Sequence, residues 1–577
     1  MRPRALHRLA ILALAASLAR AERFGELDVV QMPPDPGETV FGYAEHRFRV
    51  ANDGAQPRAV TIELSSTAGP GVTLRRTVVV GPRSAAVVAL WQPALPMSHV
   101  PHAEVFSDAR RVGRLELGNP YFPHGGYYWR SDSPLVLTGR SLDAPRLEAR
   151  FAPPAPPTPP GEIPPTPQPT VRFARAEQAV GAWSPHWLAY SRYDGVALSV
   201  EEYRGAPDGV RDALRRYAEA GGALLIFGAT PPDAARAGER LRTQPVGFGA
   251  ILYGRDADAA AYDDMEIREI KARLETYRQS DQWRRRLSLD NLPALRGAFA
   301  GGIPFRTIFL LMLGFGVLIG PLNLIYAHRR RRPAQLLWTT PALSFAATAL
   351  LFAWGLLSEG TTPSARLESL TLLDQSERRA ATLGLIAWYC PIAPAGGLRF
   401  SGDTEIEIAG DRERGGCVVD WTRDQHLARG WVSARTPAAV YARKVEPRRE
   451  RLRVAREGDR LRVVNGLGAD IASLWLADRD GRIHQGVRIP AGAEALLDLR
   501  GLRATASPRY TGFYCLGGEP WAAAWETLTN DPAAALRPGE YLALLDDSPF
   551  LETGLEGRLK AQRRARVLGV FGPEDLP

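Results

Sequence analysis

Apolar and polar residues alternate along the first part of the chain, and this pattern predicts β-structure. Between residues 37 and 118, short alternating runs are separated by turn signals such as Asn52-Asp53-Gly54. The clearest runs are His46–Val50, Ala59–Leu64, Val72–Val80 and Ala85–Trp91. Alternation with a period of two is typical of half-buried strands in a two-sheet sandwich. We therefore predict a small β-sandwich over residues 22–130.

The pattern changes near residue 131, where short apolar runs alternate with a helical repeat. Pro134–Thr138 and Asp194–Ser199 read as buried strands, and Val210–Ala220 places its apolar residues on one helical face. Gly221-Gly222 then ends the helix before the apolar run Ala223–Phe227. This order predicts an α/β domain with a parallel sheet over residues 131–300. Within it, residues 153–169 contain ten prolines and predict an exposed insertion.

Two long uncharged stretches follow, Thr307 to Ala327 and Ala334 to Leu357. Each is long enough to cross a bilayer as a helix, so we predict transmembrane helices over residues 303–327 and 334–357. The loop between them, residues 328–333, carries Arg329, Arg330, Arg331 and Arg332. These four arginines are topology determinants, because basic loops stay on the cytoplasmic side.

The N-terminus gives an independent indication of orientation. Arg2, Arg4 and Arg8 precede an apolar run that ends near Leu18, which is typical of a cleavable signal peptide over residues 1–21. Export of residues 22–302 would agree with a cytoplasmic arginine loop. We therefore expect a membrane protein with two spans and most of its chain on the exported side of the membrane.

Alternating runs return after the second stretch and predict an exported, mostly β domain over residues 358–577. Strands are expected at Arg460–Val464, Ala472–Ala477, Arg482–Ile489 and Glu494–Leu499. Asp478-Arg479-Asp480-Gly481 superficially matches a calcium loop, but Ile489 stands where the loop needs glutamate, so a hairpin turn is favoured. Near the C-terminus we predict a helix over Leu551–Arg566 and a final strand over Val567–Phe571.

Composition excludes some classes of function more clearly than it identifies one. The chain has 577 residues, 45% hydrophobic residues and a net charge of +9, and nearly all of its 72 basic residues are arginines. This arginine bias gives little support to nucleic-acid binding, so no nucleic-acid partner is expected. The Arg284–Arg286 run is a candidate contact for anionic lipid, although a solvated helix end is the simpler interpretation.

Cysteine and histidine do not form a convincing catalytic or metal-binding set. Cys390, Cys417 and Cys515 would allow one disulfide and one remaining thiol in an oxidising compartment, and their pairing stays open. His99, His102 and His124 lie in proline-containing segments without a completing carboxylate or cysteine. We expect neither a metal nor a cofactor.

The α/β segment resembles class I glutamine amidotransferase-like domains. The resemblance is carried by Tyr193–Ser199, the following helix, and Ala220–Gly228. It implies a flavodoxin-like fold in which the strand after the paired glycines leads into an elbow that bears a nucleophilic cysteine. Here that position reads Gly228-Ala229-Thr230, and residues 1–389 contain no cysteine. The resemblance therefore implies a degenerate elbow and a non-catalytic relative.

The resemblance extends into the two apolar stretches. Gly320–Asn323 and Trp338–Pro341 are similar to segments of uncharacterised bacterial proteins that join an exported amidotransferase-like domain to a two-helix membrane anchor. Asn323 is costly in lipid unless it is bonded to the partner helix, and Pro321 and Pro341 each free a backbone carbonyl. We therefore predict a hairpin clasp formed by Pro321, Asn323, Trp338 and Pro341.

These inferences combine into one expectation and two alternatives. The expected protein has an immunoglobulin-like (Ig-like) β-sandwich, an amidotransferase-like α/β domain, a transmembrane hairpin and a mostly β C-terminal domain. It would act as a non-catalytic scaffold or binding protein of the cell envelope, in contact with the lipid bilayer and with envelope proteins. The alternatives are an envelope hydrolase with an unrecognised site and a small-ligand sensor.

Overall fold

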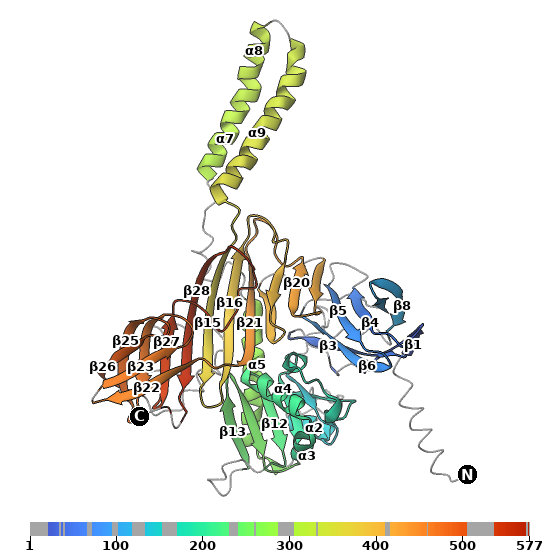
Figure 1. Cartoon of the computed structure of the whole chain (residues 1–577), viewed down its shortest axis with the longest axis vertical. Helices are drawn as coiled ribbons and strands as arrows, with labels where there is room; N and C mark the ends of the chain where they lie inside the picture. Colours follow the sequence, from blue (N-terminus) through green and yellow to red (C-terminus); the bar gives the residue numbers. More distant parts are fainter. Residues whose placement is uncertain are drawn as a thin grey trace, which may run out of the picture.

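The computed structural model describes residues 21–575 except for 34–35, 38–40, 66–71, 95–101, 118–132, 153–169, 230–239, 259–260, 287–304, 331–332, 410–415, 459, 505–535 and 573–574. The described chain consists mainly of strands, which form four sheets (Figure 1). The multidomain, β-rich organisation predicted from the sequence is confirmed at this level. The predicted proline-rich insertion and, apart from Ala21, the predicted signal peptide lie outside the described residues.

Two sheets contain the predicted N-terminal strands. The four-stranded sheet has the order β1 (Ala21–Phe24), β2 (Leu27–Gln31), β3 (Ala44–Asn52) and β6 (Ser84–Gln92). The seven-stranded sheet has the order β17 (Leu398–Phe400), β20 (Gln425–Arg429), β19 (Cys417–Asp420), β5 (Val72–Val80), β4 (Arg58–Ser65), β7 (His102–Ser107) and β8 (Arg110–Glu116). Alternate side chains of β4, from Val60 to Leu64, are fully buried, as its period-two pattern predicts.

The seven-stranded sheet joins parts of the chain that lie on opposite sides of the long helices in sequence. β19 runs parallel to β5, with Cys417 opposite Val72 and Asp420 opposite Arg75. The Nε atom of Arg75 also lies 2.9 Å from a carboxylate oxygen of Asp420. The described N-terminal and C-terminal parts therefore share one hydrogen-bonded sheet.

A third, six-stranded sheet forms the α/β unit. Its order is β10 (Arg172–Arg175), β9 (Leu135–Thr138), β11 (Gly195–Ser199), β12 (Ala223–Phe227), β14 (Gly249–Gly254) and β13 (Leu241–Val246). The first five run parallel, and β13 is an antiparallel edge strand. The accompanying helices are α2 (Ala144–Arg150), η1 (Val180–Ala182), η2 (Trp187–Tyr190), α3 (Val200–Gly205), α4 (Asp208–Glu219) and α5 (Asp264–Arg286).

Burial in this unit follows the sequence pattern. Every residue of β11 and β12 is buried, as expected for central strands covered on both faces. The predicted apolar face of α4 is buried as well, and the Tyr217 hydroxyl on it donates a hydrogen bond of 2.9 Å to the Tyr193 carbonyl. The helix is thereby fixed against the loop that enters β11.

The fourth sheet is the largest and contains strands from the C-terminal region. Its order is β18 (Thr404–Ala409), β21 (Ala438–Pro447), β16 (Arg379–Tyr389), β15 (Ser364–Asp374), β28 (Lys560–Val570), β27 (Glu540–Leu545), β24 (Ile471–Ala477), β25 (Arg482–Ile489), β26 (Glu494–Arg503), β23 (Arg460–Gly466) and β22 (Arg451–Glu457). The four strands expected at residues 460–499 are present. The turn at Asp478–Gly481 joins β24 to β25 as a hairpin, as predicted.

The predicted helix over Leu551–Arg566 is wrong. Residues 551–559 contain no helix, and Lys560–Val570 form strand β28. This strand pairs along its whole length with β15 and through its second half with β27. Local residues such as Lys560, Gln562 and Arg563 are good helix formers, but these long-range strand pairings override their preference.

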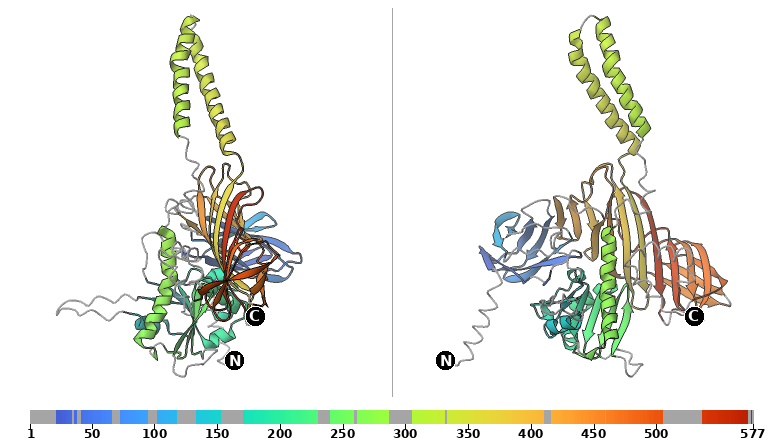
Figure 2. Two further views of the ribbon diagram at one scale, coloured as in Figure 1. Left: turned by 90° about the vertical axis from the view of Figure 1, so that its left-hand side faces the viewer. Right: turned by 180° about the vertical axis from the view of Figure 1, so that it is seen from behind.

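Helices connect the α/β unit to the large sheet. They are α7 (Phe305–Val317), a π-helical turn η5 (Leu318–Leu322), α8 (Asn323–Arg329), η6 (Pro333–Gln335) and α9 (Leu336–Glu359). The α7–α8 segment and α9 lie side by side and rise away from the sheets (Figures 1 and 2). By length and composition, one described helix qualifies as a membrane span, through the window Leu336–Ala353. None of that window is buried against protein.

Tyr43 forms hydrogen bonds to parts of three sheets, one through its backbone and the others through its side chain. The Tyr43 backbone N–H, just before β3, donates to the Ser191 hydroxyl of the α/β unit at 2.8 Å. Its own hydroxyl accepts from the backbone N–H of Ile406 in β18 at 3.1 Å and from the Gln425 side-chain amide in β20 at 2.7 Å. The same hydroxyl donates to the Ile406 carbonyl at 3.3 Å. Tyr43 is completely buried, so these bonds form inside the protein.

Candidate functional site

In α/β units, ligands commonly bind at the carboxyl ends of the parallel strands. β9 and β11 lie side by side, although β10 follows β9 in the chain. The strand order therefore changes direction between them, and crevices at such positions commonly hold ligands. Ser141 follows the end of β9, and Ser199 ends β11.

The carboxylate of Glu202 occupies this position. One of its oxygens accepts the backbone N–H of Ser141 at 3.0 Å, and the other accepts the backbone N–H of Ser199 at 3.3 Å. In return, the Ser199 hydroxyl accepts the backbone N–H of Glu202 at 3.2 Å, which completes a capping box at the start of α3. The chain thus satisfies these backbone donors with a carboxylate of its own.

Gly139 leaves space for the Glu202 carboxylate because it has no side chain. A Cβ atom added at this glycine would lie 2.1 Å from a Glu202 oxygen, closer than any ordinary contact. The hydroxyls of Ser141 and Ser199 lie 2.9 Å apart at the same place. The Ser199 hydroxyl also lies 3.5 Å from a Glu202 oxygen, so this carboxylate is bonded to the backbone N–H groups of both serines and, more weakly, to one of their hydroxyls.

The predicted degenerate elbow lies at the end of the neighbouring strand β12. Gly228 has a φ angle of +78°, so the left-handed position of this turn carries no side chain. A Cβ atom at Gly228 would contact only Val200 and Ala257, at 3.5 and 3.7 Å. The Ala229 N–H donates to the Gly254 carbonyl at 3.0 Å, and Thr230 lies outside the described residues. The described part of the turn therefore presents no nucleophile.

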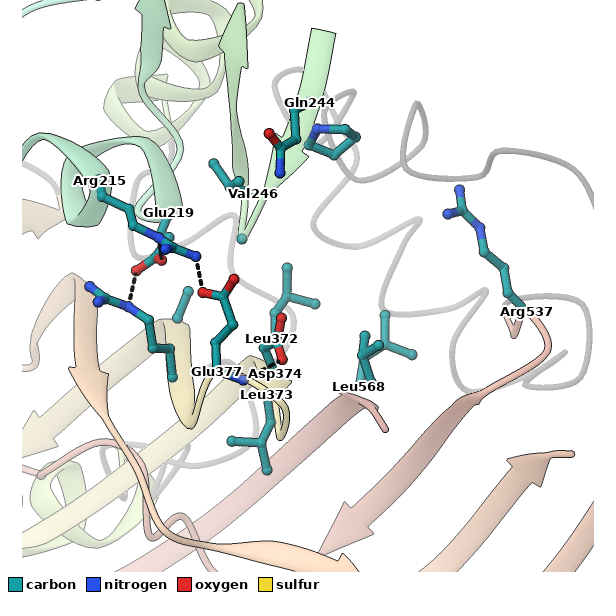
Figure 3. A pocket seen from close by; sticks show the side chains of 15 residues that line it. Arg215, Glu219, Gln244, Val246, Leu372, Leu373, Asp374, Glu377, Arg537 and Leu568 are labelled. Atoms are coloured by element: carbon teal, nitrogen blue, oxygen red, sulfur yellow. Dashed lines mark hydrogen bonds and ion pairs between the residues drawn. The ribbon is translucent and has the colours of Figure 1, made fainter. Parts of the chain in front are cut away.

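A pocket of about 340 Å³ lies where the α/β unit meets the large sheet. Figure 3 shows Arg215 and Glu219 on α4 facing Glu377 of the β15–β16 turn, with Gln244 and Val246 of β13 to one side. Leu372, Leu373 and Leu568 supply an apolar wall from the large sheet. Arg537 also lines the pocket, from the segment before β27.

Ion pairs connect the two walls of this pocket, which belong to the α/β unit and to the large sheet. Glu219 accepts from the Nε atoms of Arg215 and Arg379, both at 3.0 Å. Arg379 also donates to Asp212 at 2.9 Å, and Arg215 pairs with Glu377. Three arginine–carboxylate contacts therefore cross the junction between α4 and β16, because Arg379 and Glu377 belong to the large sheet.

The charges in this network compensate one another. Burial raises the pKa of Glu219, while Arg379 and Arg215 oppose that change. Burial would lower the pKa of Arg379, but Glu219 and Asp212 outweigh it and raise the pKa. Since each Glu219 oxygen accepts a guanidinium N–H, the carboxylate is ionised at neutral pH. The network holds the α/β unit in place and offers little uncompensated charge to a ligand.

The predicted hairpin residues lie in the long helices. The Asn323 side chain is buried, accepts from the Thr339 hydroxyl at 3.0 Å and donates to the Thr340 hydroxyl at 3.3 Å. Pro321 lies in the π-helical turn and Pro341 inside α9. The Trp338 side chain is 80% exposed. Threonines therefore supply the polar contact across the helices, which the sequence reasoning did not identify.

The other residues singled out from the sequence are distributed over the molecule. Arg329 ends α8 and Arg330 follows it, whereas Arg331 and Arg332 lie outside the described residues. Cys390 and Cys417 are buried, and Cys515 lies outside the described residues, so the pairing stays a prediction. His102 bonds Glu104 at 3.1 Å, while His99 and His124 are not described. The described residues hold no cluster of three metal-ligating side chains.

Comparisons with known proteins give no family. No protein-family model matches the sequence, and no curated protein matches it. Among solved structures, the chain is similar to the yeast δ-COP mu-homology domain, both alone and with a Dsl1 peptide. Both matches have 6% identity and a TM-score of 0.18, and they cover 36% of this chain and 95–96% of the yeast domain. A likeness at this level carries no argument about fold or function.

Proposed function

We propose that this protein is a non-catalytic binding or scaffold protein, anchored in a bacterial inner membrane by two helices and exposed to the periplasm. The observation that carries the non-catalytic part is the Glu202 carboxylate at the junction of β9 and β11. A protein that used this crevice for a ligand would leave its backbone donors available. Here they are bonded to the chain itself.

The strand order supports an amidotransferase-like, flavodoxin-like origin for the α/β unit. With the parallel strands numbered along the chain, β10-β9-β11-β12-β14 corresponds to the order 2-1-3-4-5, which is the flavodoxin-like order. The elbow expected after β12 falls at Gly228 and Ala229. The proposed relative has therefore kept the sheet and lost the nucleophile.

The seven-stranded sheet supports two membrane crossings rather than one. β5 precedes the long helices and β19 follows them, yet the two strands are hydrogen-bonded neighbours. Both must therefore lie on the same side of any membrane. If α9 crosses, the α7–α8 segment has to cross as well, because an odd number of crossings would separate the paired strands. The resulting hairpin places the arginine loop opposite the sheets.

A reactive-probe experiment tests the non-catalytic part. The full chain, purified in detergent, is treated with serine-reactive fluorophosphonate and with a glutamine-analogue electrophile. We expect no stoichiometric labelling at a single residue. Labelling that disappears in Ser199→Ala or Thr230→Ala, but persists in Ser84→Ala on an exposed strand, would support the hydrolase instead.

A small-ligand sensor is the second candidate, and the junction pocket is the observation that favours it. Its volume of about 340 Å³ falls in the range of small-molecule sites, and such sites often lie between domains. A ligand bound there would raise the melting temperature of the whole chain. Substituting Gln244, which lines the pocket, with alanine should abolish that rise.

A further inference from the structure

The end of the large sheet nearest the long helices is fixed by strand register. α9 ends at Glu359, and β15 begins at Ser364. Lys560, the first residue of β28, pairs with Ser364, and its N–H donates to the Pro363 carbonyl at 2.9 Å. Tyr389, the last residue of β16, pairs with Ser364 from the other side. Five residues span at most about 17 Å, so this end of the sheet lies close to the end of α9.

An exposed apolar loop continues from this end of the sheet. It is formed by residues 392–396, which we call the 392–396 loop, with the sequence Ile-Ala-Pro-Ala-Gly. Ile392 is 54% exposed, and Ala393 and Ala395 are exposed as well. No charged residue occurs between Trp388 and Leu398. The loop is held in shape by a hydrogen bond of 2.8 Å between the His426 ring and the Gly396 carbonyl.

Positive charge also lies at this end of the sheet. Arg558 and Lys560 are exposed, and neither is paired with a carboxylate among the described residues. The carboxylate of Glu556, two residues before Arg558, is bonded to Arg399 at 3.5 Å. Arg564 is exposed too, but it lies four residues deeper, about 13 Å along the strand.

We propose that this end of the large sheet rests on the bilayer surface, with the 392–396 loop in the interfacial layer and Arg558 and Lys560 against anionic lipid headgroups. This inference rests on the proposed membrane anchorage. Exposed apolar residues beside unpaired cations match the chemistry of that surface. Arg564 contributes less, because charges at exposed sites are screened within about 10 Å.

Spin labelling of the full chain in vesicles tests this contact. A nitroxide is attached at Ala393→Cys, and its collision rates with oxygen and with a water-soluble nickel complex are measured. Ser376→Cys, in the exposed turn at the opposite end of β15, serves as the aqueous reference. Phe345→Cys, 78% exposed on α9, serves as the lipid reference. Unsubstituted protein carried through the same labelling measures any reaction of the native cysteines.

The label at 393 should collide with nickel at least fivefold less often than the label at 376. Equal nickel collision rates at 393 and 376 would overturn the contact, provided that the label at 345 is shielded. If the label at 345 is itself exposed to nickel, or if carbonate-washed vesicles carry no protein, the anchorage has failed instead. Failure of the surface contact and failure of the membrane anchorage therefore give different results.

Lipid composition tests the charged part of the proposal. The label at 393 should collide with nickel less often in vesicles with one quarter phosphatidylglycerol than in vesicles of phosphatidylcholine alone, because the contact is stronger there. Arg558→Gln/Lys560→Gln should lower the equilibrium constant of the contact in the anionic vesicles by roughly 25-fold, at about fivefold for each charge. Arg449→Gln/Arg451→Gln removes two exposed charges near the opposite end of the sheet and should leave it unchanged. Equal behaviour of the two double variants would contradict a headgroup contact.

Discussion

Buried polar side chains, rather than a shared apolar core alone, determine how the sheets of this protein meet. Tyr43 shows this most clearly, since its hydroxyl is bonded to both β18 and β20. We expect Tyr43→Phe to lower the free energy of unfolding by about 1–3 kcal/mol, because a buried N–H of Ile406 and the Gln425 amide both lose their acceptor. Denaturant titration of the full chain in detergent measures the loss.

Tyr253→Phe is the matched control for this prediction. Tyr253 is half-buried, and its hydroxyl makes no hydrogen bond to another described residue. Its loss should change the free energy of unfolding by less than 0.5 kcal/mol. Equal effects of the two substitutions would show that the Tyr43 hydroxyl is not the connection described here.

Two partly buried histidines make stability depend on pH. Burial lowers the pKa of His46 and of His186 to about 4, with Arg192 adding to the effect at His46 and Asp403 opposing it at His186. The unfolded chain binds these protons near pH 6.5, whereas the folded chain does not. Stability should therefore fall as the pH drops from about 6.5 to about 4, by up to about 3 kcal/mol for each histidine.

Chemical denaturation at pH 7.5, 5.5 and 4.5 measures this dependence. The groups around the two rings are Gln92 and Arg192 for His46, and Asp403, Arg216 and Arg76 for His186. In His46→Gln/His186→Gln, the fall in the free energy of unfolding between pH 7.5 and 4.5 should be smaller than in the unsubstituted chain. An identical slope in both proteins would contradict the assignment.

At the residue scale, the sequence predicted some features of the candidate site and missed others. A degenerate elbow was predicted at Gly228, Ala229 and Thr230, and the structure describes the first two of these residues as a turn in which Gly228 has a φ angle of +78°. The capping box at Ser199 and Glu202 is readable as an S-x-x-E pattern, although it was not recognised. The approach of Glu202 to Gly139 could not be predicted, because it depends on the neighbourhood of β9 and β11. Asn323 was expected to bond the partner helix, but its threonine partners follow only from the helix register.

At the level of elements, the local pattern was sufficient to predict each strand or helix whose own sequence has a clear period. β4, β5 and β25 and the apolar face of α4 lie where alternation or helical spacing placed them. The first part of β28, Lys560–Arg566, was mistaken for a helix because it consists of helix-favouring residues, and its pairing with β15 involves residues almost 200 positions away. The end of β28, from Val567, was predicted correctly as a strand. Long-range pairing is the information that a local pattern lacks.

The junction between α4 and β16 yields a prediction at this scale. Arg379→Met should destabilise the chain by about 3 kcal/mol, because it leaves the buried Glu219 without one of its two cationic partners. Glu219→Gln should cost a similar amount. The double variant should lose at least 1 kcal/mol less than the sum of the two, as a double-mutant cycle by denaturant titration would show. Simple additivity would mean that the pair does not couple α4 to the sheet.

For the whole molecule, the pairing of β5 with β19 makes the parts before and after the helices one structure. We expect Val419→Ala, at a fully buried position of β19, to cost about 2 kcal/mol and to speed amide hydrogen exchange in β4 and β5. Val463→Ala, equally buried in β23, should not change exchange there. Unchanged exchange in β4 and β5 for Val419→Ala would indicate that the two parts are independent.

The same pairing makes the central claim testable by topology. Single cysteines are introduced at Val79 and Val487, which are 73% and 60% exposed, and at His328 beside the arginine loop. Cells with a permeabilised outer membrane are then treated with a membrane-impermeant maleimide. The anchored scaffold predicts labelling at 79 and 487 and protection of 328 until the inner membrane is opened. Labelling of 79 and 487 from opposite sides, or of 328 in intact inner membranes, would contradict a two-helix anchor with the sheets in the periplasm.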